Sequence, residues 1–108
     1  MKTARIENMT KGWFVGAFSP TAHHTNSCEV ALKTYKAGET EEAHFHKIAT
    51  ETTLIVSGKV EMCDQVWGPG DIVVLEPGDI TAFRCLEDTV TVVVKEPGAL
   101  NDKYLMGE

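Results

Sequence analysis

Basic residues are scarce in this sequence. Ten Lys and Arg stand against 16 Asp and Glu, which gives a formal net charge of -6 at pH 7 with neutral histidines. An acidic protein repels the phosphate backbone of nucleic acids and the anionic surface of membranes. We therefore expect neither nucleic acid nor a membrane as a partner.

Long apolar runs are also missing. No stretch of signal-peptide length follows the N-terminus, and the apolar run at 12–18 is too short to span a bilayer. The cysteines, Cys28, Cys63 and Cys85, are odd in number, so they cannot all pair within one chain. This favours reduced thiols that pack as small hydrophobic side chains. We expect a cytoplasmic protein.

Several catalytic signatures are absent as well. The sequence has no Gly-rich phosphate loop, no Ser-His-Asp set, no CxxC pair, no internal repeat and no long amphipathic helix. With 108 residues, the chain has room for one domain, predicted to span 1–108. Nucleotide binding through a P-loop, serine hydrolysis and dithiol redox chemistry are therefore not indicated.

Short segments rich in Val, Ile, Thr and aromatic residues alternate with Gly and Pro, which predicts an all-β fold. Segments 54–56, 72–75 and 92–94 are apolar at successive positions, so both faces of these strands need cover. This favours two packed sheets, with the N-terminal segment or a second subunit outside, and hence a homodimer. The predicted strands lie near 12–18, 29–36, 43–48, 52–56, 59–67, 71–75, 80–86 and 89–95.

The most informative residues are His44, His46 and Glu51. Residues two apart on a strand project to the same face, about 7 Å apart, so the two imidazoles can converge. Glu51 can return to that face from the next strand. Two histidines and one carboxylate suit a divalent metal, Fe, Mn, Ni or Zn, with positions open for substrate. The spacing fits a hydrogen-bonded polar cluster equally well.

These residues resemble the first motif of the cupin superfamily, G-x5-H-x-H-x4-E-x6-G. Every position of that motif matches, at Gly38, His44, His46, Glu51 and Gly58. The resemblance covers most of the chain, with a barrel core at about 28–95. It implies a jelly-roll β-barrel of two antiparallel sheets that holds a small molecule and often a divalent metal.

The second cupin motif is incomplete. Gly70 opens it, but Thr81 stands where the family has a third histidine and Cys85 where it has Asn. A hydroxyl is a poor ligand for such cations, so we expect a metal that is weakly bound or dispensable. Thr81, Phe83 and Cys85 share one strand face and are predicted to line the ligand pocket.

Three functions follow from this pattern. The first is a cupin that binds a small polar organic ligand at His44, His46 and Glu51, with isomerase, epimerase or lyase chemistry on a sugar or hydroxy acid. The second is an Fe(II)-dependent dioxygenase, against which Thr81 argues. The third is a metal-free binding or regulatory module. His23 and His24 are expected in a solvated loop, and the tail at 97–108 as a helical turn or an arm on a neighbour.

Overall fold

The alternation of β-formers and turn residues produces ten short strands within the part of the chain that the computed structural model describes, residues 1–106. One 3-10 turn, η1 (Ile6–Asn8), precedes them. The strands in chain order are β1 (Trp13–Val15), β2 (Glu29–Tyr35), β3 (Thr40–Phe45), β4 (Thr50–Ser57), β5 (Val60–Met62), β6 (Gln65–Trp67), β7 (Ile72–Leu75), β8 (Thr81–Cys85), β9 (Thr89–Glu96) and β10 (Tyr104–Leu105).

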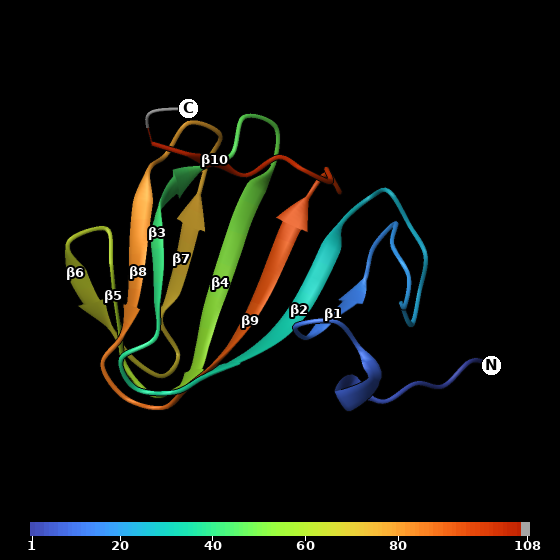
Figure 1. The fold of residues 1–108 in the computed structure, drawn as a ribbon, viewed down its shortest axis with the longest axis horizontal. Helices are drawn as coiled ribbons and strands as arrows, with labels where there is room; N and C mark the ends of the chain where they lie inside the picture. The colour runs from blue at the N-terminus through green and yellow to red at the C-terminus, as the bar shows by residue number, and fades with distance from the viewer. Residues whose placement is uncertain (107–108) are drawn as a thin grey trace.

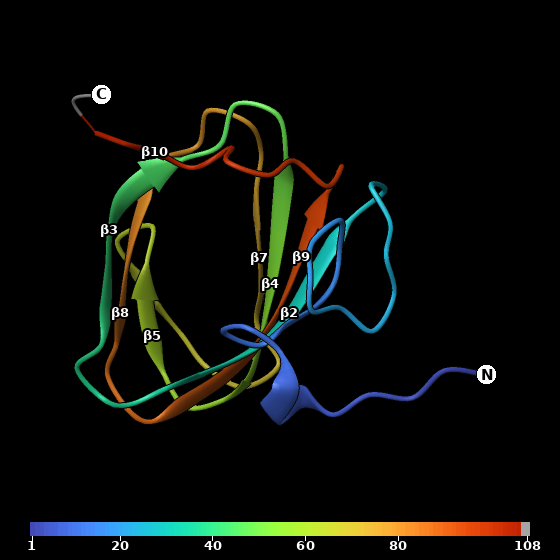
Figure 2. The same ribbon diagram turned by 45° about the vertical axis from the view of Figure 1, so that its right-hand side comes forward.

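The strands form two antiparallel sheets of five strands each. The first sheet has the order β1-β2-β9-β4-β7, and the second has the order β10-β3-β8-β5-β6. The sheets face each other, as Figures 1 and 2 show. Burial alternates along β7 and β8, as expected for strands with one face inward. The inward apolar side chains form one core: Ile55, Val60, Met62, Val73, Leu75, Phe83 and Cys85.

The jelly roll of two antiparallel sheets is as predicted, but it is not a closed barrel. Among residues 1–106 no strand pairs in both sheets, so each sheet keeps two edges, β1 and β7 in the first and β10 and β6 in the second. The turn at 68–71 carries the chain from β6 in one sheet to β7 in the other. Consecutive strands on opposite sheets share no ladder, which leaves the structure open between them.

The segment predicted as one strand at 59–67 is a hairpin. It breaks at Cys63 and Asp64, which both have positive φ, 54° and 59°. Two consecutive positive φ angles are typical of a tight hairpin turn, which usually signals itself through Asn or Gly. Cys63 gives no such signal, so the sequence prediction of one strand was wrong.

Two further boundaries differ from the prediction. The strand expected at 43–48 is β3 and ends at Phe45, so His46 lies just beyond it. Within residues 97–106 the tail does not form the helical turn that was one expectation, and an arm on a neighbour stays a prediction. The tail packs on its own chain as β10, with Tyr104 opposite Phe45 and Leu105 opposite His44. The last two tail residues, 107 and 108, lie outside the described residues.

The outer face of the first sheet is covered in part. The N-terminal segment lies over β2 and β9, where Ile6 and Met9 line one hollow with Leu32 and Val92. The outer residues of β4 and β7 are exposed: Val56 48%, Ile72 60% and Val74 52%. The N-terminal cover agrees with expectation, and the homodimer stays a prediction. Within residues 1–106, no helix reaches the length and apolarity of a membrane span.

Candidate metal centre

The three candidate ligands come from both sheets. His44 lies on β3, His46 directly after it, and Glu51 on β4 in the facing sheet. The short crossing at 47–49 connects the sheets. Both histidines are buried, at 6% and 5% exposure. One ligand atom from each of the three side chains lies within 4.8 Å of the others. The convergence expected from strand spacing therefore exists, although Glu51 reaches the site from the opposite side.

Backbone carbonyls orient the two imidazoles. The Nδ1 of His44 lies 2.8 Å from the carbonyl oxygen of Glu42, and the Nδ1 of His46 lies 2.7 Å from that of Asp102. A carbonyl only accepts, so Nδ1 carries the proton in each ring. Nε2 of His44 then remains available, and the two rings stand nearly edge to face with centroids 5.6 Å apart. Such second partners of histidine typically fix the tautomer of a metal ligand.

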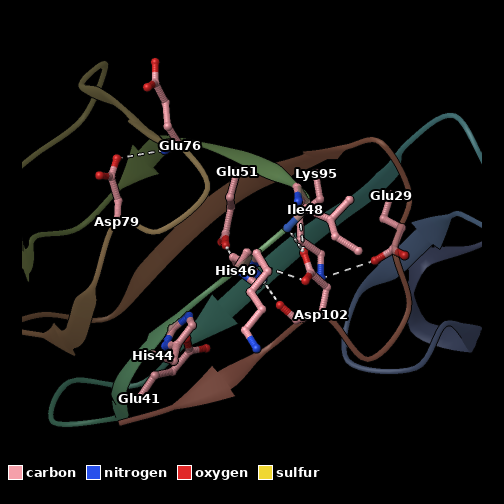
Figure 3. Close-up of polar contacts among 12 residues, drawn as sticks. Glu29, Glu41, His44, His46, Ile48, Glu51, Glu76, Asp79, Lys95 and Asp102 are labelled. Carbon is pink, nitrogen blue, oxygen red and sulfur yellow. Dashed lines mark hydrogen bonds and ion pairs between the residues drawn. The ribbon is translucent and has the colours of Figure 1, made fainter.

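His46 and Glu51 form a close pair. The Nε2 of His46 lies 2.7 Å from Oε2 of Glu51, as the dashed line in Figure 3 shows. This hydrogen bond to Glu51 raises the pKa of His46, against the opposing effect of burial. Burial would raise the pKa of Glu51, but the hydrogen bond and charge of His46 outweigh it and lower that pKa. These two shifts favour the charged form of both partners.

Asp102 holds the crossing segment in place. Its carboxylate accepts hydrogen bonds from the backbone N–H groups of Lys47, Ile48 and Ala49, at 3.1, 3.0 and 2.9 Å. Burial would raise the pKa of Asp102, but these donors lower it. Asp102 thus fixes the segment between His46 and Glu51 and orients His46 through its own carbonyl (Figure 3). Sequence reasoning missed it, because no local pattern links residue 102 to residue 46.

The three side chains open onto a cavity of about 500 Å³ between the sheets. Thr81 and Phe83 line this cavity. Cys85 is 1% exposed, belongs to the apolar core, and is not among the cavity-lining residues in the described chain. Burial raises the pKa of its thiol. Cys85 is therefore placed as a packing residue rather than a pocket residue.

Thr81 occupies the position opposite His44 in the β3–β8 ladder. Its hydroxyl accepts a hydrogen bond from the Cys63 N–H at 3.1 Å and donates one to the Ala82 carbonyl at 2.7 Å. Both roles of the hydroxyl are thus used by the backbone. Thr81 does not replace the missing imidazole as a ligand, which leaves three donors at this centre.

The remaining histidines lie elsewhere. His23 and His24 are exposed in the loop between β1 and β2, as expected for solvated residues. Six charged cavity residues, by contrast, were not anticipated at this place. The cavity that holds the candidate ligands is also lined by Lys11, Glu29, Lys33, Glu41, Lys95 and Lys103. The strand pattern placed their segments, but no motif marked these residues.

The donor set fits a divalent metal. Two imidazole nitrogens and one carboxylate gather at one place on the cavity wall, and both rings are anchored through the nitrogen that a metal would not need. The residues that would hold the ion are His44, His46 and Glu51.

No family model matches the sequence, and no curated protein matches it. Solved structures do. A conserved protein with a double-stranded β-helix domain from Klebsiella pneumoniae is 24% identical, with a TM-score of 0.69 over 78% of this chain and 74% of that chain. An RmlC-like cupin protein from Desulfovibrio desulfuricans is 22% identical, with a TM-score of 0.60 over 69% and 76%.

A DMSP lyase from Ruegeria pomeroyi is 22% identical, with a TM-score of 0.68 over 87% of this chain and 49% of that chain, so this chain spans about half of it. These similarities agree with the strand order and with the complete first motif around His44, His46 and Glu51. The chain therefore has the fold of the cupin superfamily.

Proposed function

We propose that this protein binds a small polar organic ligand in the cavity between its sheets, beside a divalent metal held by His44, His46 and Glu51. The metal binds weakly, because three donors rather than four are present. The chemistry that fits such a centre is isomerase, epimerase or lyase chemistry on a sugar or hydroxy acid. One structural neighbour is a lyase, which is consistent with this class.

A single observation carries the proposal. In both imidazoles Nδ1 is hydrogen-bonded to a backbone carbonyl. One ligand atom from each histidine and one from Glu51 lie within 4.8 Å of one another. Among residues 1–106, Nε2 of His44 has no hydrogen-bond partner, on the wall of a cavity of about 500 Å³.

The bound cation would supply Lewis acidity, polarising a carbonyl or hydroxyl oxygen of the ligand. The protein's own residues position the ligand and manage protons. When Glu51 is not bound to the cation, its carboxylate can accept a proton from the ligand, although its lowered pKa makes it a weak base. The apolar wall that includes Phe83 and Met62 limits water at the same place.

The test is metal binding by the purified chain. Wild type is freed of metal with a chelator, and its melting temperature is then measured with Mn(II), Ni(II) and Zn(II). We expect a clear rise that the double variant His44→Gln, His46→Gln lacks, because a ligand that binds only the folded state stabilises it. The matched control is His23→Gln, His24→Gln, which should respond like wild type. Equal responses of the two double variants would exclude the metal centre.

An iron oxygenase is the second candidate. Two histidines and one carboxylate are the donor set of non-haem iron oxygenases, and the engaged hydroxyl of Thr81 leaves only these three donors. Elemental analysis of protein produced with excess iron separates the candidates. Stoichiometric iron would favour the oxygenase, whereas a substoichiometric mixture of metals would favour the first proposal.

A metal-free binding or regulatory module is the third candidate, and the 2.7 Å contact between His46 and Glu51 favours it. That pair is satisfied without an ion. In this case, the melting temperature of wild type stays constant across all three metals, as it does in the His44→Gln, His46→Gln variant.

A further inference from the structure

The cavity wall combines four lysines with three carboxylates, those of Glu29, Glu41 and Glu51. Lys11, Lys33, Lys95 and Lys103 all line the cavity, although the whole chain has only ten basic residues and a net charge of -6. The ammonium groups of Lys33 and Lys95 lie over the ring of Trp13, 5.4 and 4.9 Å from its centroid. The scarce basic residues of an acidic protein therefore gather where a small molecule would be enclosed.

Lys33 is a partly buried cavity lysine without an ion pair among the described residues. Its ammonium donates to the carbonyl of Lys11 at 3.1 Å, and no carboxylate lies within ion-pair distance of it in residues 1–106. Burial lowers the pKa of Lys33, and the neighbouring lysines lower it further, while Glu41 offsets only part of this. Like charges held together in a partly buried place are unfavourable unless an anion joins them.

Lys95 is already engaged. Its ammonium lies 3.3 Å from Oε1 of Glu29, with both side chains largely buried (Figure 3). Glu41 is also engaged, through the hydroxyl of Tyr35 at 3.4 Å. The acidic residues of the cavity therefore have partners other than Lys33.

Thr91 adds a second donor next to Lys33. The two residues are direct partners in the β2–β9 ladder, and both line the cavity. Thr91 is 1% exposed, and its Oγ1 has no hydrogen-bond partner among the described residues. Buried hydroxyl groups nearly always find partners in folded proteins. A ligand atom that accepts from Thr91 would supply the missing one.

Glu29 offers the complementary group at the other end of β2. It is 4% exposed, and its Oε2 also has no partner among residues 1–106. Glu29, Lys95 and Glu51 lie on one row across β2, β9 and β4, which places Glu29 on the metal-centre side. Four residues, roughly 13 Å along the strand, separate it from Lys33. The cavity wall thus has hydrogen-bond donors at one end, on Lys33 and Thr91, and an acceptor at the other, on Glu29.

We propose that the cavity selects a hydroxylated organic anion several carbons long. Its carboxylate or phosphate group contacts Nζ of Lys33 and Oγ1 of Thr91, and one of its hydroxyls donates to Oε2 of Glu29. The proposal rests on the proposed function in placing the ligand in this cavity, but it requires no metal.

The test uses metal-free protein in chelator and low salt, with three probes at millimolar concentration. D-gluconate carries a carboxylate, sorbitol has the same carbon chain without charge, and inorganic phosphate represents the other anionic group. We expect gluconate, phosphate or both to raise the melting temperature of wild type, and sorbitol to leave it unchanged. Titration calorimetry should show at least tenfold weaker anion binding by Lys33→Gln and by Thr91→Val.

Lys59→Gln is the matched control, because Lys59 is an exposed lysine outside the cavity. It should bind the anions like wild type, which separates site binding from general salt stabilisation. Without any anion, Thr91→Val should melt above wild type, since it removes a buried hydroxyl that has no hydrogen-bond partner among the described residues.

Equal anion responses of Lys33→Gln and Lys59→Gln, or no response of wild type to either anion, would overturn the anion site. Metal titration of the same samples tests the metal centre separately. Stabilisation by an anion without any response to metals supports the anion site and rejects the metal centre. The reverse result retains the metal centre and rejects the anion site.

Discussion

His44 and Thr81 occupy the same rung of the β3–β8 ladder, yet they have different roles. Nδ1 of His44 is hydrogen-bonded to a backbone carbonyl, and its Nε2 faces the cavity. The hydroxyl of Thr81 is instead hydrogen-bonded to the backbone at 63 and 82. The donors of the first motif therefore point into the cavity. In the second motif, position 81 has the same place in the ladder, but its side chain offers no metal ligand. A site can lose one ligand without losing the fold, because the backbone satisfies the replacement locally.

Removing a candidate ligand of the first motif should have the largest effect on stability and metal binding. Glu51→Gln removes the carboxylate that pairs with the buried His46, which should lower the free energy of unfolding by about 2 kcal/mol. It should also abolish metal stabilisation. Urea unfolding near pH 6 measures the first effect and melting with Ni(II) the second. Glu87→Gln, in an exposed pair with Lys59, is the control and should change neither. Wild-type metal stabilisation in Glu51→Gln would contradict the assignment.

Adding the missing histidine of the second motif should have the next largest effect on metal binding. Thr81→His places an imidazole opposite His44, where paired Cβ atoms lie about 5 Å apart. We expect metal affinity to rise about tenfold or more, equivalent to about 1.4 kcal/mol, as measured by competition with a chelator. Thr81→Val is the control, since it loses the same hydroxyl without adding a donor. If both variants bind metal equally, position 81 does not face the metal.

The role of Asp102 is tested by weakening its hydrogen bonds to the segment between His46 and Glu51. Asp102→Asn weakens the acceptor for three N–H groups and should cost about 1–2 kcal/mol of stability. Metal affinity should fall about tenfold, as for other residues that orient ligands. Asp79→Asn, which affects an exposed acceptor of one N–H, is the control. An unchanged metal affinity would reduce Asp102 to a purely structural role.

The smallest effect is the pH dependence of the metal-free protein. The raised pKa of His46 means that its contribution to stability is complete below the unfolded value of about 6.5. That contribution is lost as the pH rises through the folded pKa. The stability difference between wild type and His46→Gln should therefore shrink from pH 6 to pH 9, as followed by urea unfolding. A difference that grows over this range would contradict the ion pair.

Local patterns were sufficient for much of the fold. Alternating β-formers and Pro-Gly turns placed most strands within a few residues, and the spacing of His44, His46 and Glu51 located the centre. They failed at Cys63 and Asp64, where a hairpin turn forms without Gly. They also failed for β10, since a two-residue strand exists only through its pairing with β3.

The sequence by itself determined the all-β class, the turn positions and the identity of three possible ligands, because these depend on residues close together in the chain. Only the tertiary structure decided which residues lie around these ligands and line the cavity. Asp102 lies 56 positions from His46, and Lys33 meets Thr91 only because β2 pairs with β9. Sheet pairing and burial choose such partners, and they leave no fixed spacing in the sequence from which to read them.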